Sequence, residues 1–434
     1  MSEIATDPYA PASAADRVMY AACIAVMPLL FLFAPRFARH AIGKLNLRTL
    51  RTAENRAFFD RNRRYSGEDE TRVQGMIDTL KARIGEDDWA GVSDLIAGLD
   101  TSREALSQSN MRLGDVALDF LRHELADQIG LPNACNSDHY YRIPDSVLAR
   151  VETASRTRPD DLWLTALLAQ IHIDRGWCAR GGGWSHEVTE EGWQGLMDSF
   201  RTAHALLERF DPDEVRSPFY ARVRFQLLAT ADAEGGLDEA RAPYHDWSDL
   251  DIANPAPHRS FAFLALPRWF GSWPSFEAEA RAAAGRTKHR LGQGAYAMFY
   301  LQAFAYDEGD ALHNLDAEFF SIALDDLVRH DADPAARAAQ AALTLSRVLE
   351  PEPVTLLGEL FDLIANRKRD ALKPLIRQLF DRYLTHLPTE EGSGAEVELL
   401  DLISEAYQPE IREGKRMIFT TEGVRWVDAP RLDA

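Results

Sequence analysis

Residues 160–176, DDLWLTALLAQIHIDRG, place apolar side chains at the three- and four-residue spacing of one helix face. Residues 177–184 follow as WCARGGGW, and their three successive glycines end the helical pattern. Glycine beside a large aromatic side chain is typical of a sharp chain reversal that packs under the ring. The stretch therefore predicts a helix followed by a tight turn, and most of the chain repeats this combination.

Helical spacing continues along nearly all of the chain beyond Gly67. Glycines and prolines interrupt it at short intervals, as expected for helices that pair into hairpins. The fold class predicted is all-α, an array of helical hairpins with a small β-hairpin near the C-terminus, where apolar runs flank Glu422-Gly423. The expected later helices are 190–209, 217–233, 237–244, 261–270, 275–284, 294–306 and 312–330, and the expected strands are 417–420 and 424–427.

Changes in composition divide the chain into segments. Residues 132–146 hold two prolines with Asn, Ser and Asp, so we expect a loop that separates the first helices from the hairpin array. The predicted segments are a tail (1–17), an apolar helix (18–35), a basic helix (36–66), an N-terminal helical region (67–131), a helical-repeat domain (145–334) and C-terminal helices with a terminal hairpin (335–434).

The composition excludes several classes of protein. With 46% hydrophobic and 10% aromatic residues, the 434-residue chain can fill a substantial core. Its net charge is −20, and residues 1–64 hold ten Lys/Arg against five Asp/Glu, which leaves 38 against 63 beyond them. An acidic body repels phosphate backbones, so no nucleic-acid partner is expected. The three cysteines (Cys23, Cys135 and Cys178) form no C-x-x-C pair, which favours a reducing compartment without disulfides or structural zinc.

The N-terminal region contains an uncharged run at residues 18–35, VMYAACIAVMPLLFLFAP. As a helix it would measure about 27 Å, close to the roughly 30 Å of hydrocarbon that a spanning segment crosses. Arginines and lysines follow it and few precede it, so the positive-inside tendency predicts a single-pass anchor in the inner membrane with the body in the cytoplasm. The alternative is a buried first helix of a soluble cytoplasmic protein.

Two resemblances rest on the quoted motifs. Trp177-x-x-Arg180-Gly181, followed some ninety residues later by Pro267-Arg268-Trp269-x-Gly271-Ser272, is similar to an uncharacterised bacterial family known as a domain of unknown function. The resemblance spans roughly residues 85–330 and implies a helical, repeat-like protein without an assigned activity. The helices of 160–350 also resemble degenerate tetratricopeptide-type repeats, in which small residues let helices approach closely.

The loop 180–187 is the first candidate binding site. Backbone N–H groups of successive glycines can converge on an anion, and Arg180 can add a bidentate clamp, with His186 and Glu187 beside it. No phosphate-loop pattern is present, and a helix rather than a strand precedes the glycines. The alternative interpretation is structural: Gly181 ends a helix, and Arg180 pairs with a carboxylate under Trp177 or Trp184.

The second block, residues 267–273, offers an aromatic–guanidinium pair for a ligand in Arg268 and Trp269. The alternative is that Pro267 and Gly271 bend a hairpin and the tryptophans fill the seam between helices. We take Trp177, Gly181, Pro267 and Gly271 as structural residues of the two blocks. Because hairpins that follow each other stack side by side, the two blocks are expected to lie close together.

No metal site, catalytic residue or cofactor is predicted. His172, Asp174, His186, Glu187 and His204 lack the spacing of a metal-binding motif, since His172 and Asp174 point to different sides of a helix. The sequence holds no G-x-S-x-G elbow, and no cysteine–histidine pairing emerges from the spacing. His258, which precedes Arg259, is expected to be solvated.

These observations favour a membrane-tethered helical-repeat interaction protein, a scaffold or adaptor that binds protein partners. The alternative is a hydrolase or transferase with its site near the Arg180–Glu187 loop. A deep pocket with convergent polar groups would favour the enzyme, and an open groove with exposed aromatic residues would favour the adaptor.

Overall fold

The structure is a computed structural model that describes residues 67–107, 110–130, 140–181, 185–231, 236–306, 308–349, 363–389 and 394–428. The expected membrane anchor at 18–35 and the basic helix at 36–66 lie outside these residues. Among the helices within these ranges, none is both long enough and apolar enough to cross a bilayer.

Helices account for most of this part of the chain, as the sequence predicts. The first group comprises α3 (Glu68–Gly85), α4 (Trp89–Ser102), α5 (Leu113–Leu125) and α6 (Asp145–Thr157). A long series follows: α7 (Leu162–Arg180), α8 (Glu190–Leu207), α9 (Pro218–Ala231), α10 (Gly236–Leu250), α11 (Pro255–Leu264), α12 (Trp273–Leu291), α13 (Gly294–Tyr306), α14 (Glu308–Asn314), α15 (Ala317–Arg329), α16 (Pro334–Leu349), α18 (Leu363–Tyr383), α19 (Gly394–Ala406) and α20 (Gln408–Arg412).

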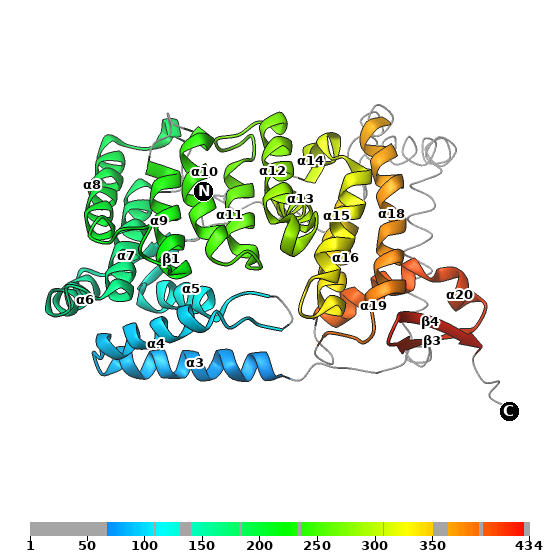
Figure 1. Ribbon diagram of the computed structural model, residues 1–434, viewed down its shortest axis with the longest axis horizontal. Coiled ribbons are helices and arrows are strands. Elements are labelled where there is room, and N and C mark those ends of the chain that lie inside the picture. The colour runs from blue at the N-terminus through cyan, green and yellow to red at the C-terminus, as the bar shows by residue number, and fades with distance from the viewer. Residues whose placement is uncertain are drawn as a thin grey trace, which may run out of the picture.

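Helices α7 to α16 and helix α18 stand in a row along the long axis of the molecule (Figure 1). Helix α7 packs against α8, α9 against α10, and α13 against both α12 and α15. Helices α3, α4 and α5 lie along the lower edge of this row in Figure 1, beneath α7 to α11. Helix α11 packs more extensively against α13 than against α12, its neighbour along the chain.

Capping side chains set several helix ends. Asp161 accepts a hydrogen bond from the backbone N–H of Leu164 and so begins α7. Gly181 ends the same helix at a φ of +74°, a conformation in which a Cβ atom is unfavourable. Ser272 and Ser275 form a reciprocal capping box at the start of α12. These ends explain why the chain turns at the glycine-rich and aromatic blocks.

Close approach of α7 and α8 depends on glycine. A Cβ atom on Gly195 would lie 2.8 Å from the Cβ of Ala179, and one on Gly176 would lie 3.1 Å from atoms of Ser199 and Phe200. Without these side chains the two helix backbones come close enough for extensive contact. Phe200 then packs edge-on against Trp177 with ring centroids 6.0 Å apart.

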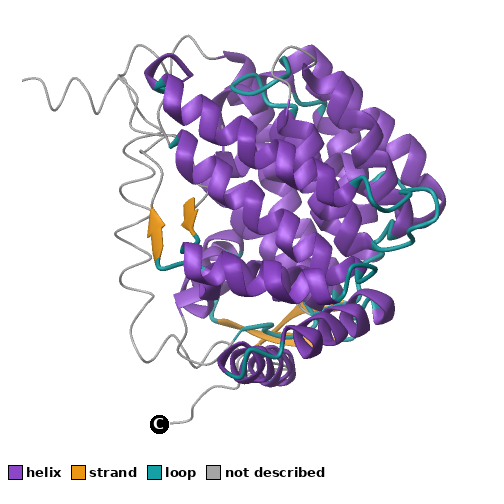
Figure 2. Ribbon diagram, turned by 90° about the vertical axis from the view of Figure 1, so that its left-hand side faces the viewer, coloured by secondary structure: helices purple, strands orange, loops and turns teal. Residues whose placement is uncertain are grey.

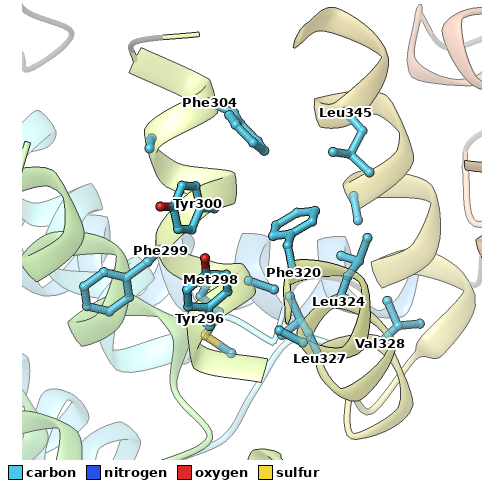
Figure 3. Close-up of a cluster of buried hydrophobic side chains, with 14 of the residues drawn as sticks. Tyr296, Met298, Phe299, Tyr300, Phe304, Phe320, Leu324, Leu327, Val328 and Leu345 are labelled. Carbon is cyan, nitrogen blue, oxygen red and sulfur yellow. The ribbon is translucent and has the colours of Figure 1, made fainter. Parts of the chain in front are cut away.

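Two hydrophobic cores share the molecule. One is formed by α3 to α8 together with one set of residues from α9, and the other extends from α9 to the C-terminal strands. In α9, Tyr220 and Val223 belong to the first core, whereas Ala221 and Phe225 belong to the second. Figure 3 shows part of the second core, where side chains of α13 such as Tyr300 face Phe320 and neighbouring apolar residues. Helix α9 is thus apolar on opposite sides and joins the two cores.

Two small antiparallel sheets lie at the edges of the helical body (Figure 2). The C-terminal one pairs β3 (Lys415–Thr420) with β4 (Gly423–Asp428), which confirms the predicted hairpin. The other pairs β1 (Gln128–Gly130) with β2 (Tyr140–Arg142) and was not predicted. Residues 140–142 therefore form a strand rather than part of the expected loop, and Arg142 at its end forms an exposed ion pair of 2.9 Å with Asp127.

Candidate functional site

A cleft of about 500 Å³ opens where α5, β2 and α7 meet α9, α10, α11 and α13. Its volume lies within the range of about 300–1,000 Å³ that is usual for sites of small ligands. Helix α5 and β2 belong to the first half of the chain, while α11 and α13 follow more than a hundred residues later. The cleft therefore forms at the junction of the two cores.

Polar contacts hold the two sides of this junction together. Arg112 makes two hydrogen bonds to the carboxylate of Asp251, of 2.5 and 2.8 Å. Asn254, which caps α11, donates to Asp115 of α5 at 3.0 Å. These three hydrogen bonds join α5 or its N-terminal flank to the segment that begins α11, so they hold the two sides of the cleft at a fixed distance.

One wall of the cleft carries a buried ion pair between α5 and α7. Arg122 approaches both carboxylate oxygens of Asp174, with distances of 2.6, 3.0 and 3.1 Å. Gln170 donates a further hydrogen bond of 3.2 Å to the same carboxylate. The guanidinium of Arg122 also lies 4.6 Å from the ring centre of Tyr141. These contacts hold the side chains of Arg122 and Asp174 in place.

A second arginine from α9 continues this wall. Arg222 contacts the carboxylate of Asp115 at 3.1 Å, the backbone carbonyl of Asp115 at 3.0 Å and the carboxylate of Asp119 at 2.5 Å. Asp119 is the most exposed of the three carboxylates, with 45% of its side chain accessible. We refer to Arg122, Arg222, Asp115, Asp119 and Asp174 as the ion-pair wall.

Burial shapes the electrostatics of the ion-pair wall. It raises the pKa of Asp115 and of Asp174 above the ordinary aspartate value, and the adjacent arginines offset only part of the effect. Burial opposes the charge of Arg122, yet Asp174 and Asp119 raise its pKa above the usual value. The carboxylates are committed to arginine or amide partners, so the arrangement suits binding and positioning more than proton transfer.

The opposite side of the cleft is formed by α11 and α13. Arg259 is exposed at the cleft edge, where its Nε donates to the side-chain oxygen of Gln302 at 3.0 Å. Among the residues that the structure describes, Arg259 has no carboxylate within ion-pair distance. Partial enclosure by protein lowers its pKa, and the charge of Arg337 adds to the effect. An arginine remains protonated under such shifts, so this edge of the cleft is cationic.

Aromatic side chains line the space between the two sides. Phe263 lies near Trp269 and Tyr306, with ring centroids 5.2 and 4.9 Å apart. Trp177 contributes from α7, and the largely buried pair Phe225 and Trp247, with ring centroids 5.6 Å apart, lines the cleft from α9 and α10. Phe263, Trp177, Trp269 and Tyr306 are half-buried, so part of each ring is left for contact with an apolar or aromatic group.

The two tryptophan–glycine blocks of the sequence meet at this cleft. Trp177 of the first block and Trp269 of the second both line it. The arginine of the first block points elsewhere, since Arg180 lies 5.6 Å from the ring centre of Trp177 and 5.1 Å from that of Trp193. Its guanidinium also donates to the carbonyl of Gly181 at 3.0 Å. Arg180 therefore packs against the rings of Trp177 and Trp193, and the expected pair with a carboxylate stays a prediction.

The remaining predicted candidates lie outside the lining of the cleft. His186 and Glu187 are exposed in a short 3₁₀ turn, Ser185–Glu187. Arg268 is exposed and donates to the backbone carbonyl of Tyr306, with its guanidinium 5.7 Å from the Tyr306 ring centre. The described residues of this loop, 180, 181 and 185–187, therefore lie outside the lining of the cleft, which the sequence did not predict.

Glycine and proline of the second block have defined surroundings. Pro267 is exposed at the end of α11, where the chain turns. A Cβ atom on Gly271 would lie 1.8 Å from the backbone carbonyl oxygen of Ala265, so no other residue fits without a shift of the backbone. This close return of the chain places Trp269 over Phe263 at the cleft.

Sequence reasoning missed most of the polar groups of the cleft. Asp174 was considered as a metal ligand and is instead the partner of Arg122. Its only signal in the sequence is a carboxylate inside an otherwise apolar helix. The prediction that His258 is solvated is wrong, because His258 is fully buried in α11 and its Nδ1 lies 2.8 Å from the Tyr244 hydroxyl. Burial lowers the pKa of His258 to about 4.

Comparison with known proteins found no family model, no curated protein and no solved structure that matches this chain. The resemblances to a domain of unknown function and to tetratricopeptide-type repeats stay predictions. The functional argument therefore depends on the geometry of the cleft.

Proposed function

We propose that this protein is a helical-repeat interaction protein that holds a segment of a partner protein in the cleft between its two cores. The observation that supports this proposal is the lining of the cleft, which combines half-buried aromatic rings with a fixed ion-pair wall and the cationic edge at Arg259. Aromatic rings together with a few placed charges are typical of recognition sites. The row of stacked helices supports a tetratricopeptide-like array as its scaffold.

The hydrogen bonds that the buried carboxylates accept favour a binding function over a catalytic one. Asp174 accepts hydrogen bonds from Arg122 and Gln170, and Asp115 accepts from Arg222 and Asn254. A general acid or base needs a carboxylate that can exchange its proton with a substrate. These carboxylates would have to leave their partners first, so the ion-pair wall is better suited to shaping the cleft.

The proposal includes a tether at the cytoplasmic face of the inner membrane through residues 18–35. Support for the tether comes from the length of the apolar run and the basic residues that follow it. Carbonate extraction of membranes from cells that express the full chain tests this part. We expect the protein in the membrane pellet, and recovery entirely in the soluble fraction would favour the soluble cytoplasmic alternative.

Site-specific crosslinking in cells tests the binding function. A photoreactive amino acid replaces Gln226, which lines the cleft, and in a matched chain it replaces Met197, which is 45% exposed on α8. We expect the Gln226 probe to form one discrete adduct whose crosslinks map to a single contiguous segment of one protein. The Met197 probe should not form this adduct.

A second variant distinguishes cleft binding from accidental capture. Ala256 is half-buried and lines the cleft, so Ala256→Trp should fill part of it and remove the Gln226 adduct while the helical spectrum is unchanged. An adduct that persists in Ala256→Trp, or that forms equally well from Met197, would contradict the proposed function.

A further inference from the structure

Three polar side chains at the cationic edge of the cleft have hydrogen-bond donors that no described residue accepts. The Nε of Arg259 is used by Gln302, which leaves the two terminal guanidinium nitrogens. The side-chain nitrogen of Gln302 and the hydroxyl of Ser260 also have no hydrogen-bond partner in the part of the chain that the structure describes. All three residues line the cleft and come from α11 and α13. We call them the donor edge.

The donor edge suits a planar acceptor with two oxygens. The terminal nitrogens of an arginine form a fork that matches a carboxylate, and an amide N–H beside them adds a third donor. Residues Pro255 and Ala256 of the first turn of α11 also line the cleft, so the positive end of that helix dipole is near the same space. These groups all favour negative charge.

The charge balance of the cleft limits how much negative charge it accepts. The ion-pair wall holds three carboxylates against two arginines, an excess of one negative charge, and Arg259 brings the lining to neutrality. A group with a single negative charge can pair with Arg259. A dianion such as a phosphate monoester would bring a second charge toward the excess carboxylate of the opposite wall, which is unfavourable.

The space between the donor edge and the ion-pair wall is lined by rings. Trp177 contributes from α7, and Trp269 and Tyr306 both pack against Phe263. A flat aromatic group can pack against such rings in offset or edge-on geometry. The lining thus offers an aromatic site next to a site for one carboxylate.

We infer that the anchor recognised by the cleft is an aromatic ring that carries one carboxylate a few bonds away. This inference rests on the proposed function and specifies its chemistry. The ring lies among Trp177, Trp269 and Tyr306, and the carboxylate accepts hydrogen bonds from Arg259, Gln302 and Ser260. The same chemistry can come from an aromatic residue beside an acidic side chain within a protein segment, or from a free aromatic acid.

Calorimetric titration of the full chain with matched probes tests the anchor. N-acetylphenylalanine carries the ring and the carboxylate, N-acetylphenylalaninamide carries the ring without the charge, and phenyl phosphate carries the ring with a dianion. We expect the first probe to bind about tenfold more tightly than either of the others, as expected for one charge-assisted hydrogen-bonded pair. Equal binding of acid and amide, or tighter binding of phenyl phosphate, would overturn the inference.

Two additional probes separate the sources of the anchor. The blocked dipeptide N-acetyl-Phe-Glu-amide presents its carboxylate on a side chain, as an internal protein segment does, and 3-phenylpropionate is a free aromatic acid. We expect the dipeptide to bind at least as tightly as 3-phenylpropionate. Tighter binding of 3-phenylpropionate would support an aromatic ring with one carboxylate as the ligand, but it would show that this ligand is a free acid and not part of a protein segment.

Variants show whether the donor edge is responsible. Arg259→Gln should reduce the preference for acid over amide from about tenfold to near unity. Arg290→Gln removes the same charge from an exposed position of α12 and should leave the preference unchanged. If Arg259→Gln keeps the preference for the acid probe over the amide probe, the inference is wrong, even when the Gln226 probe still forms its adduct. If the Gln226 probe forms no adduct in a chain with Arg259 intact, the proposed function itself is wrong.

Discussion

At the residue scale, the ion-pair wall shows how individual charges inside the protein depend on their partners. Asp174 has only 2% of its side chain accessible, and Arg122 provides most of its hydrogen bonds. A buried pair of this kind contributes little net stability compared with an apolar pair, but removal of one member leaves the other charge without compensation. The wall is therefore sensitive to single substitutions.

Arg122→Gln should destabilise the fold by about 3–5 kcal/mol, because the buried carboxylate of Asp174 keeps only its bond from Gln170. Urea unfolding followed by circular dichroism measures the change. Arg201→Gln provides a control, since its pair with Asp198 is exposed and should leave the unfolding midpoint close to that of the wild type. Equal midpoints for both variants would show that the Arg122 pair is not buried in solution.

His258 predicts a pH dependence of stability. Its pKa is about 4 in the folded protein because of burial, and the ordinary value of 6.5 applies when the chain unfolds. The unfolded chain therefore binds more protons between these values, so the contribution is complete above pH 6.5 and is lost as the pH falls toward 4. At pH 5 the loss should be about 2 kcal/mol relative to pH 7.

Unfolding in urea at pH 7 and pH 5 measures this loss. His258→Gln lacks the titrating group, so its unfolding free energy should change less between the two pH values than that of the wild type. The other groups that titrate in this range are common to both proteins, and the comparison cancels them. Identical pH dependence in the two proteins would contradict the buried neutral state of His258.

At the element scale, helix packing depends on where glycine is required and where it is not. Gly195 lies in α8 at the contact with α7, whereas Gly285 lies in α12 with open space around it. Both positions are inside helices, so alanine should gain similar helix propensity at each, about 1 kcal/mol. The difference between the two substitutions isolates the cost of the α7–α8 contact.

Gly195→Ala should destabilise the protein by about 1–3 kcal/mol, because the new Cβ would lie 2.8 Å from the Cβ of Ala179 and separate the helices. Gly285→Ala should stabilise it by about 1 kcal/mol. Thermal unfolding compares the two with the wild type. A stabilising Gly195→Ala would show that α7 and α8 are farther apart than their contacts indicate.

At the scale of the whole molecule, α9 joins two cores that would otherwise be separated by the polar groups of the cleft. Tyr220 and Val223 are buried in one core, and Ala221 and Phe225 in the other. Loss of either core would expose one side of this apolar helix. The two cores should therefore unfold together.

We expect one unfolding transition, with coincident midpoints by tryptophan fluorescence and by circular dichroism. Phe225→Ala, a truncation in a buried ring cluster, should lower that midpoint by the equivalent of about 3–5 kcal/mol and keep the two signals coincident. Two separate transitions in the wild type would show that the cores are independent units.

The sequence determined the features that depend on neighbours along the chain. Apolar spacing predicted most of the helices from α7 to α15, but α11 lies at Pro255–Leu264 instead of 261–270, and the single helix expected at 312–330 is divided into α14 and α15. The apolar runs 417–420 and 424–427 on either side of Glu422-Gly423 predicted the C-terminal hairpin, whose strands are slightly longer in the structure. Such elements follow local periods and turn preferences, which a single sequence contains.

Only the tertiary structure decided which distant residues meet. The lining of the cleft runs from Met111 to Tyr306, and Arg122, Asp174 and Arg259 give no local sign of the partners they take. The same holds for His258, whose sequence neighbours suggest exposure although packing against Tyr244 buries it. The spacing of apolar residues predicts which face of a helix is apolar. The arrangement of the other helices decides which polar groups come together and which are removed from water.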